Sequence, residues 1–208
     1  MIEVIDQDGC RIVTINRPEK ANSLTAEMLE RLCEIAEGEG DVPVLILTGA
    51  GKVFSAGADL EEAKAGLATS DLWERLSGAI AALPGLTIAA LNGTLAGGAN
   101  GMALACDLRI AVPGAKFFYP VMKLGYRPQP SDPTRMAALI GPARTKLILM
   151  GGQKITANEA LRFGLVDRIV EDDVVSAARE IAEDTLNADP NIARAIKEMC
   201  NGAGGKMR

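Results

Sequence analysis

The chain of 208 residues is 48% hydrophobic and 24% charged, a balance typical of one globular domain, which excludes a disordered chain. Its net charge of −5, without a basic stripe, excludes the electrostatic pattern of a nucleic-acid-binding protein. The absence of histidine excludes Ser-His-Asp and Cys-His catalysis, and four widely spaced cysteines without a CxxC pair indicate reduced thiols and no metal site.

The predicted elements alternate between strands and helices along most of the chain. In chain order, we expect strands at EVI, RIVTIN, VLILTG, TIAALNG, LRIAV, KFFY and LVDRIV, because these short runs are rich in β-branched and apolar residues. Helical spacing of apolar residues predicts helices at 25–37, 73–83, 144–150, 156–164, 174–186 and 192–200. The first two strands are hairpin-like, and the alternation after them predicts a layered α/β fold. The last residues, NGAGGKMR, have the composition of a disordered end.

Two turns with an almost bare backbone stand out between these elements. FSAGADLEE (54–62) follows VLILTG, and Gly57 between two alanines leaves N–H groups open to a ligand that bulkier side chains would exclude. LNGTLAGGANG (91–101) leads into an Ala-rich helix, whose N-terminus favours negative charge. It fits neither GxGxxG nor the P-loop spacing, and taken alone Gly97-Gly98 is more often a close-packing turn. As a pair, the turns would each aim one N–H at a single oxygen, as in an oxyanion hole for a thioester enolate.

Three segments, NRPEKANSLT, VFSAGADL and LNGTLAGGANGMALACDLRIA, resemble the crotonase superfamily of enoyl-CoA hydratases and isomerases. So do PVMKLG, the long segment TRMAALIGPARTKLILMGGQKITANEALRFGLVDRIV and the ARAIKE helix, in the same order over nearly the whole chain. The resemblance implies an α/β fold, the crotonase-like spiral of ββα units with a short helical C-terminus. It also implies a core domain over 1–190, followed at 191–208 by a C-terminal helix, truncated relative to the family, and a flexible tail.

The resemblance further implies an acyl-CoA substrate, with coenzyme A as part of the thioester and no separate cofactor or metal. A homotrimer or a dimer of trimers is the assembly expected for the family. We expect no membrane partner, because no apolar run is long enough to span a bilayer. The N-terminal segment has early acids and no apolar h-region, which indicates a cytoplasmic protein.

The expected site residues follow from the resemblance residue by residue. In the family, the residue after the Gly of AGAD and a glycine of the second turn supply the oxyanion-hole N–H groups, which map onto Ala58 and Gly98. The segment around Lys20-Ala21 and the AGADL loop would hold CoA, so the expected CoA-binding residues are Lys20, Ala21, Ala56, Asp59 and Leu60. Two of them have simpler interpretations, Asp59 as a helix N-cap and Lys20 as a solvated surface lysine.

The chain departs from the family pattern where hydratases carry two catalytic glutamates. Those positions are Gly101, in the helix after the second turn, and Val121, so both carboxylates are absent. Asp132, in the loop YRPQPSDPTRM, is the candidate replacement, although an Asp shortly before PTR is more often an N-cap. Further polar residues in this loop or near the first turn are Tyr126, Arg127, Gln129, Glu61 and Glu62, the two glutamates having a solvated helix face as their simpler role.

Two functions remain open from the sequence. The first is an acyl-CoA enzyme with altered acid/base chemistry, such as isomerisation, decarboxylation or hydrolysis through a thioester enolate. Decarboxylation demands least, because loss of CO₂ needs the oxyanion hole more than a base. The second is a CoA-thioester-binding or scaffolding homologue without turnover. The discriminating feature is whether Asp132, Tyr126 or Glu62 lies within reach of an acyl group held by Ala58 and Gly98.

Overall fold

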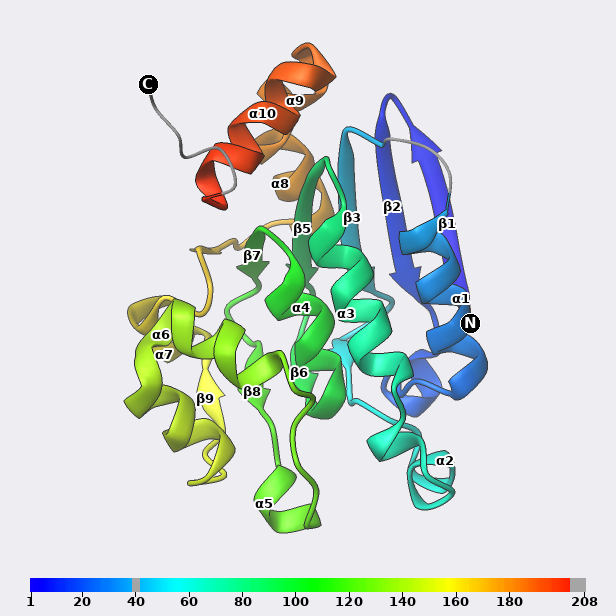
Figure 1. The fold of residues 1–208 in the computed structure, drawn as a ribbon, viewed down its shortest axis with the longest axis vertical. Helices are drawn as coiled ribbons and strands as arrows, with labels where there is room; N and C mark the ends of the chain where they lie inside the picture. The colour runs from blue at the N-terminus through cyan, green and yellow to red at the C-terminus, as the bar shows by residue number, and fades with distance from the viewer. Residues whose placement is uncertain (39–41, 203–208) are drawn as a thin grey trace.

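The computed structural model describes residues 1–38 and 42–202, and within them ten strands form two sheets (Figure 1). The larger sheet has the order β1 (Ile2–Gln7), β2 (Cys10–Ile15), β3 (Val44–Gly49), β5 (Leu86–Leu91), β7 (Leu108–Ala111) and β10 (Arg168–Ile169). The smaller sheet has the order β4 (Val53–Ser55), β6 (Thr94–Ala96), β8 (Lys116–Phe118) and β9 (Ile155–Thr156). Along the chain, β3, β5 and β7 each lead into the next strand of the smaller sheet, and helices follow, which gives a spiral of strand–strand–helix units.

Helices and short 3-10 turns connect the strands. They are η1 (Pro18–Lys20), α1 (Ala26–Glu37), α2 (Leu60–Lys64), η2 (Leu67–Thr69), α3 (Leu72–Ala82), η3 (Gly97–Ala99), α4 (Asn100–Ala105), α5 (Val121–Leu124), α6 (Asp132–Leu149), α7 (Ala157–Phe163), α8 (Val174–Ile181), α9 (Glu183–Asn187) and α10 (Pro190–Cys200). No helix of the described chain combines the length and apolar character needed to cross a membrane.

The larger sheet is covered on both faces. Alternate residues of its central strand β3 point to opposite sides. Leu45 and Leu47 pack into the core shared with α1, α3 and α4, which Figure 1 shows together on one side of this sheet, whereas Val44 and Ile46 pack with α8. All six residues of β3 are buried, as expected for a parallel strand between two helical layers. The layered α/β prediction is therefore confirmed.

Most predicted elements are present, and the differences concern two helices and several short elements. The predicted helix at 144–150 is only the second half of α6, which begins at Asp132 and changes direction at Gly141, just before Pro142. The predicted helix at 174–186 is two helices, α8 and α9, that meet at Ala182. The strands β4, β6 and β9 and the short helix α5 are not among the predicted elements, because segments of two to four residues are too short to show a period. The equally short β8 and β10 are predicted only because they lie within the longer apolar runs KFFY and LVDRIV. The tail at 203–208 lies outside the described residues, so its predicted flexibility stays a prediction.

Candidate active site

The two bare turns meet at one edge of the smaller sheet. β4 and β6 are parallel neighbours, so the turns that follow them leave the sheet at the same edge. Gly57 and Gly97 both have a left-handed backbone, with φ of 91° and 58°. A Cβ on Gly57 would lie 3.0 Å from the Ala96 carbonyl oxygen and 3.2 Å from Gly97 Cα. Glycine at position 57 therefore permits the backbones of the two turns to touch.

The first candidate oxyanion donor is the N–H of Ala58, which follows that contact. The neighbouring amide groups are used in a bridge to the preceding loop: Leu24 N–H donates to Gly57 C=O, and Asp59 N–H donates to Leu24 C=O, both at 2.8 Å. In the described part of the chain, the Ala58 N–H itself donates to no acceptor. An N–H that is held in place by its neighbours and has no partner is the kind of donor that an oxyanion hole requires.

The second candidate donor is Gly98, in the middle of η3. Its N–H lies in the first turn of that helix, where amides have no acceptor within the helix. The Gly98 nitrogen lies 3.5 Å from a Cβ built on Gly57, which brings it next to the first turn. A Cβ on Gly98 would lie 3.0 Å from the Trp73 indole, whose Nε1 donates to Leu67 C=O at 2.8 Å. The indole of Trp73 from α3 thus packs directly against Gly98 in a fixed orientation, a contact that the sequence does not predict.

Asp132 fills the space that a side chain at position 101 would need. The three atoms nearest to a Cβ built on Gly101 all belong to the Asp132 carboxyl, with Oδ1 at 2.9 Å and Oδ2 at 3.3 Å. Asp132 is fully buried, at 0% exposure, where α4 packs against α6. Its simpler interpretation as an N-cap is wrong, because Ser131 holds that position and Asp132 is the first residue of α6. A carboxyl therefore does lie beside Gly101, but it comes from α6 instead of α4.

The Asp132 carboxyl has a perturbed acidity. Oδ2 accepts a hydrogen bond of 3.0 Å from Tyr119 Oη, whereas the buried Oδ1 has no partner among the described residues. Burial raises the pKa of Asp132 to about 7, against the lowering effect of the Tyr119 hydrogen bond. Burial also raises the pKa of Tyr119, so its phenol stays protonated at neutral pH. A carboxyl with a pKa near 7 can both take and return a proton at neutral pH.

Contacts from α3 hold the first turn of α6 in place. Glu74 accepts hydrogen bonds from the Ser131 N–H at 3.2 Å and the Ser131 Oγ at 3.1 Å. Arg135 donates to the same Oγ at 2.7 Å. These groups fix the residue next to Asp132, while the Tyr119 hydrogen bond holds the carboxyl itself beside Gly101 of α4.

The two segments expected to bind CoA lie side by side. Ala56 N–H donates to Ala21 C=O at 3.0 Å, which joins the loop after η1 to the first turn. Lys20 and Ala56 are exposed, and Leu60 at the start of α2 is 77% exposed. An exposed cation and an exposed apolar side chain thus lie within four residues of this contact. The interpretation of Lys20 as a surface lysine holds as well.

Asp59 has a structural role in the same region. One carboxylate oxygen accepts from the Glu61 N–H at 3.0 Å and caps α2, as the simpler interpretation predicted. The other accepts from Arg17 Nη1 at 2.8 Å. The hydrogen bond from Arg17 holds the pKa of Asp59 below its usual value, so this carboxyl stays ionised.

The remaining polar candidates have other surroundings. Glu62 accepts from the Ala26 N–H at 2.6 Å at the start of α1, so the expected solvated face is wrong for this residue. Glu61 pairs with Lys64 on the surface, in agreement with that expectation. Of the remaining residues, Tyr126 is 37% exposed, Arg127 is exposed, and Val121 and Gln129 are buried.

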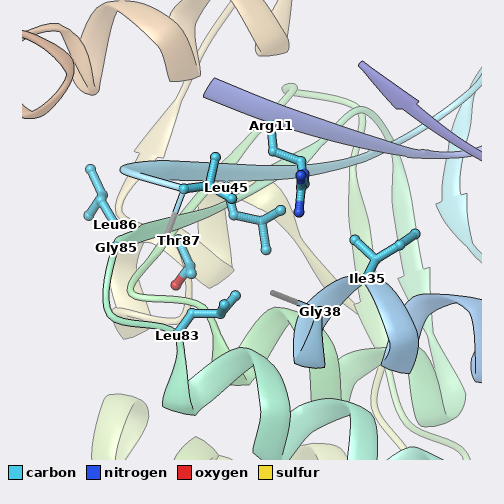
Figure 2. Close-up of a pocket in the computed structure, with 9 residues that line it drawn as sticks. Arg11, Ile35, Gly38, Leu45, Leu83, Gly85, Leu86 and Thr87 are labelled. Carbon is cyan, nitrogen blue, oxygen red and sulfur yellow. The ribbon is translucent and has the colours of Figure 1, made fainter. Parts of the chain in front are cut away.

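Two cavities lie elsewhere in the molecule and include none of Ala58, Gly98, Gly101, Tyr119 or Asp132, although Arg135 lines the larger one. Figure 2 shows the smaller one, where Leu45 near the amino end of β3 faces Ile35 of α1 and Leu83 at the end of α3. The larger is a groove of about 890 Å³ between α10, α6 and the end of α4. Both lie away from the edge at which the two bare turns meet.

The cysteines offer no reactive thiol at the site. All four are free, and Cys10, Cys33 and Cys106 are buried. Burial raises the pKa of Cys106 to about 12, so this thiol stays protonated and unreactive. Within residues 1–38 and 42–202, no cluster of three or more Cys, Asp and Glu side chains is arranged to hold a metal ion.

Comparison with known proteins gives consistent matches over nearly the whole chain. The family model described as enoyl-CoA hydratase/isomerase matches residues 6–204. A short-chain-enoyl-CoA hydratase of Clostridium acetobutylicum is 34% identical over 213 residues, which cover 95% of this chain and 80% of that protein. The crystal structure of an enoyl-CoA hydratase from Bacillus anthracis matches with a TM-score of 0.88 and 34% identity over 96% of this chain and 82% of that one. Pseudomonas aeruginosa DspI matches with a TM-score of 0.88 and 31% identity, over 99% and 88% of the two chains. The fold expected from the resemblance is therefore confirmed.

Proposed function

Since the chain belongs to the enoyl-CoA hydratase/isomerase family, we propose that it is an acyl-CoA thioester enzyme in which the N–H groups of Ala58 and Gly98 stabilise a thioester enolate. The touching turns and the unpartnered Ala58 N–H support this assignment. Each donor of such a hole is commonly worth about 2.7–4 kcal/mol of transition-state stabilisation.

The acid/base group in this proposal is Asp132. The observation that carries it is the distance of 2.9 Å between Oδ1 and a Cβ on Gly101, since the family's hydratases carry a glutamate at that position. As a base, Asp132 takes a proton from the carbon next to the thioester carbonyl. The C–H electron pair then forms the C=C bond of the enolate, and the negative charge moves to the oxygen held by the two N–H groups.

The chemistry then differs from hydration by two glutamates. Gly101 and Val121 carry no carboxylate, and Asp132 supplies one acid/base group where that mechanism uses two. General acid–base catalysis contributes about 10²–10⁴ in rate, so one missing group is a large loss. Isomerisation, decarboxylation and hydrolysis through an enolate remain compatible with one carboxyl, and decarboxylation requires the least of it.

A CoA-thioester-binding homologue without turnover is the second candidate function. The complete burial of Asp132 favours it, because a substrate must reach Oδ1 through a space that is closed in this structure. In both functions Lys20, Ala21, Ala56, Asp59 and Leu60 contact the CoA part of the ligand, with no separate cofactor. A homotrimer in the cytoplasm, acting in fatty acid metabolism, completes the proposal.

Binding and product analysis test this assignment. We expect acetyl-CoA to bind in a calorimetric titration, and Gly98→Ala to weaken binding at least tenfold, because the new Cβ would lie 3.0 Å from Trp73. Gly114→Ala is the matched control, since nothing lies within 4 Å of a Cβ there. Mass spectrometry should show crotonyl-CoA unchanged after incubation. Absence of binding would contradict the acyl-CoA assignment, and a hydrated product would contradict the loss of hydratase chemistry.

A further inference from the structure

The two oxygens of the Asp132 carboxyl have different surroundings. Oδ2 accepts from Tyr119 Oη at 3.0 Å, whereas Oδ1 is buried without a partner in the described chain. Oδ1 is also the oxygen nearer to Gly101, at 2.9 Å from the position of a Cβ there. The free oxygen is thus the one beside the helix that follows the second turn.

The surroundings of Tyr119 restrict its hydroxyl to a hydrogen bond with Asp132 Oδ2. Its side chain is 4% exposed and directly follows β8, so the phenol cannot turn to solvent. Burial raises the pKa of the phenol, so at neutral pH it remains a neutral O–H donor. Because the phenol proton of Tyr119 is donated to Oδ2, a proton that the Asp132 carboxyl gains must bind to Oδ1.

We propose that Tyr119 is a positioning residue that reserves Oδ1 of Asp132 for proton exchange with the α-carbon of the bound acyl-CoA. This inference rests on the proposed function. In the forward step the α-C–H bond breaks, its electron pair enters the enolate, and the proton forms an O–H bond with Oδ1. In the reverse step Oδ1 returns a proton, exchanged with solvent in the meantime, to the same carbon.

Charged groups near Tyr119 and Asp132 also affect the pH at which Asp132 titrates. Glu74 from α3 raises the pKa of Asp132 and Arg135 on α6 lowers it, both weaker effects than burial and the Tyr119 hydrogen bond. α4 places Gly101 beside the carboxyl and carries no charged residue. Because the Tyr119 hydrogen bond favours the ionised carboxylate, its removal must shift the titration of Asp132 to higher pH.

The test follows solvent deuterium entering C2 of butyryl-CoA as a function of pH. We expect the wild-type rate to rise through a midpoint near neutral pH. In Tyr119→Phe the midpoint should move up by about one pH unit or more, so the rate at pH 6 falls about tenfold or more. Tyr126→Phe removes the other tyrosine hydroxyl of the chain from a side chain that is 37% exposed, and it should match the wild type.

The outcomes separate this inference from the function on which it rests. A wild-type midpoint in Tyr119→Phe, together with loss of exchange in Asp132→Asn, would overturn the role of Tyr119 and leave the function standing. Undiminished exchange in Asp132→Asn would overturn the proposed function itself. If Tyr119→Phe does not fold, 3-fluorotyrosine incorporated into Tyr126→Phe labels Tyr119 alone. This more acidic phenol donates more strongly, so the midpoint should move to lower pH, and an unmoved midpoint would overturn the inference.

Discussion

Gly101→Ala probes the geometry that places Asp132 in the site. The new Cβ would lie 2.9 Å from Oδ1, closer than van der Waals contact allows, while Tyr119 restrains the carboxyl from the other side. Overpacking a core commonly costs about 1–3 kcal/mol, and alanine regains about 1 kcal/mol over glycine inside a helix. We therefore expect the free energy of unfolding to fall by about 1 kcal/mol.

A double-mutant cycle isolates the contact. In the Asp132→Ala background the carboxyl is gone, so Gly101→Ala should stabilise by about 1 kcal/mol, which gives a coupling of about 2 kcal/mol. Gly78→Ala is the matched control, because it lies inside α3 with nothing within 4 Å of its Cβ, and it should stabilise by about 1 kcal/mol in either background.

Urea unfolding provides the measurement, with the single tryptophan, Trp73, as the fluorescent probe and circular dichroism as a second signal. If Gly101→Ala stabilises the wild type as much as Gly78→Ala does, the carboxyl is not beside Gly101. A coupling energy within about 0.5 kcal/mol of zero would refute the reasoning in the same way.

Three further predictions concern the turns, the pH and the last helix. Gly57→Ala should lower the free energy of unfolding by about 1–3 kcal/mol and abolish acetyl-CoA binding. The reason is that φ of residue 57 is 91° and the new Cβ would lie 3.0 Å from the Ala96 carbonyl oxygen. A variant with the melting temperature and affinity of the wild type would contradict this prediction. The stability of the wild type relative to Asp132→Asn should fall as pH rises from about 4 to about 7. The reason is that the folded chain holds the Asp132 proton more tightly than the unfolded chain, in which this carboxyl has the ordinary pKa of 3.8. A stability difference in urea unfolding that does not change with pH would contradict a buried, proton-binding Asp132. Lys197→Met removes two hydrogen bonds of 2.7 Å, from Nζ to the Gly85 C=O and to Asp107 Oδ2. The backbone amides of α10 should therefore exchange faster with D₂O. Unchanged exchange would show that other contacts hold the helix.

The main features of the fold were predictable because they depend on local periodicity and on a collinear resemblance. The run VLILTG predicts a buried strand, and β3 is that strand. The kink in α6 was not predicted, because Gly141 and Pro142 concealed the continuity of two helical halves. The unpredicted strands β4, β6 and β9 of the smaller sheet depend on long-range pairing, which no local pattern reveals.

The site was predictable only in part. The pairing of the two bare turns follows from the sequence, since glycine and alanine after apolar runs indicate close backbone approach. The sequence left two interpretations of Asp132 open, a replacement carboxyl and an N-cap, because an Asp before a proline at a helix start looks like a cap. The position of its carboxyl depends on Tyr119 and Gly101, which belong to other segments of the chain. Tyr119 and Trp73 give no signal, because an aromatic residue beside a strand or on a helix face usually belongs to the core.

The most direct test of the central claim is the exchange of the α-hydrogens of butyryl-CoA in D₂O near neutral pH. The wild type should incorporate deuterium at C2, and Asp132→Asn should do so about 10²–10⁴ times more slowly with unchanged affinity for the ligand. Asp172→Asn, a change of the same kind at an exposed position, should behave as the wild type. Exchange at the wild-type rate in Asp132→Asn, or no exchange in a wild-type protein that binds the ligand, would contradict the assignment of Asp132 as the acid/base group.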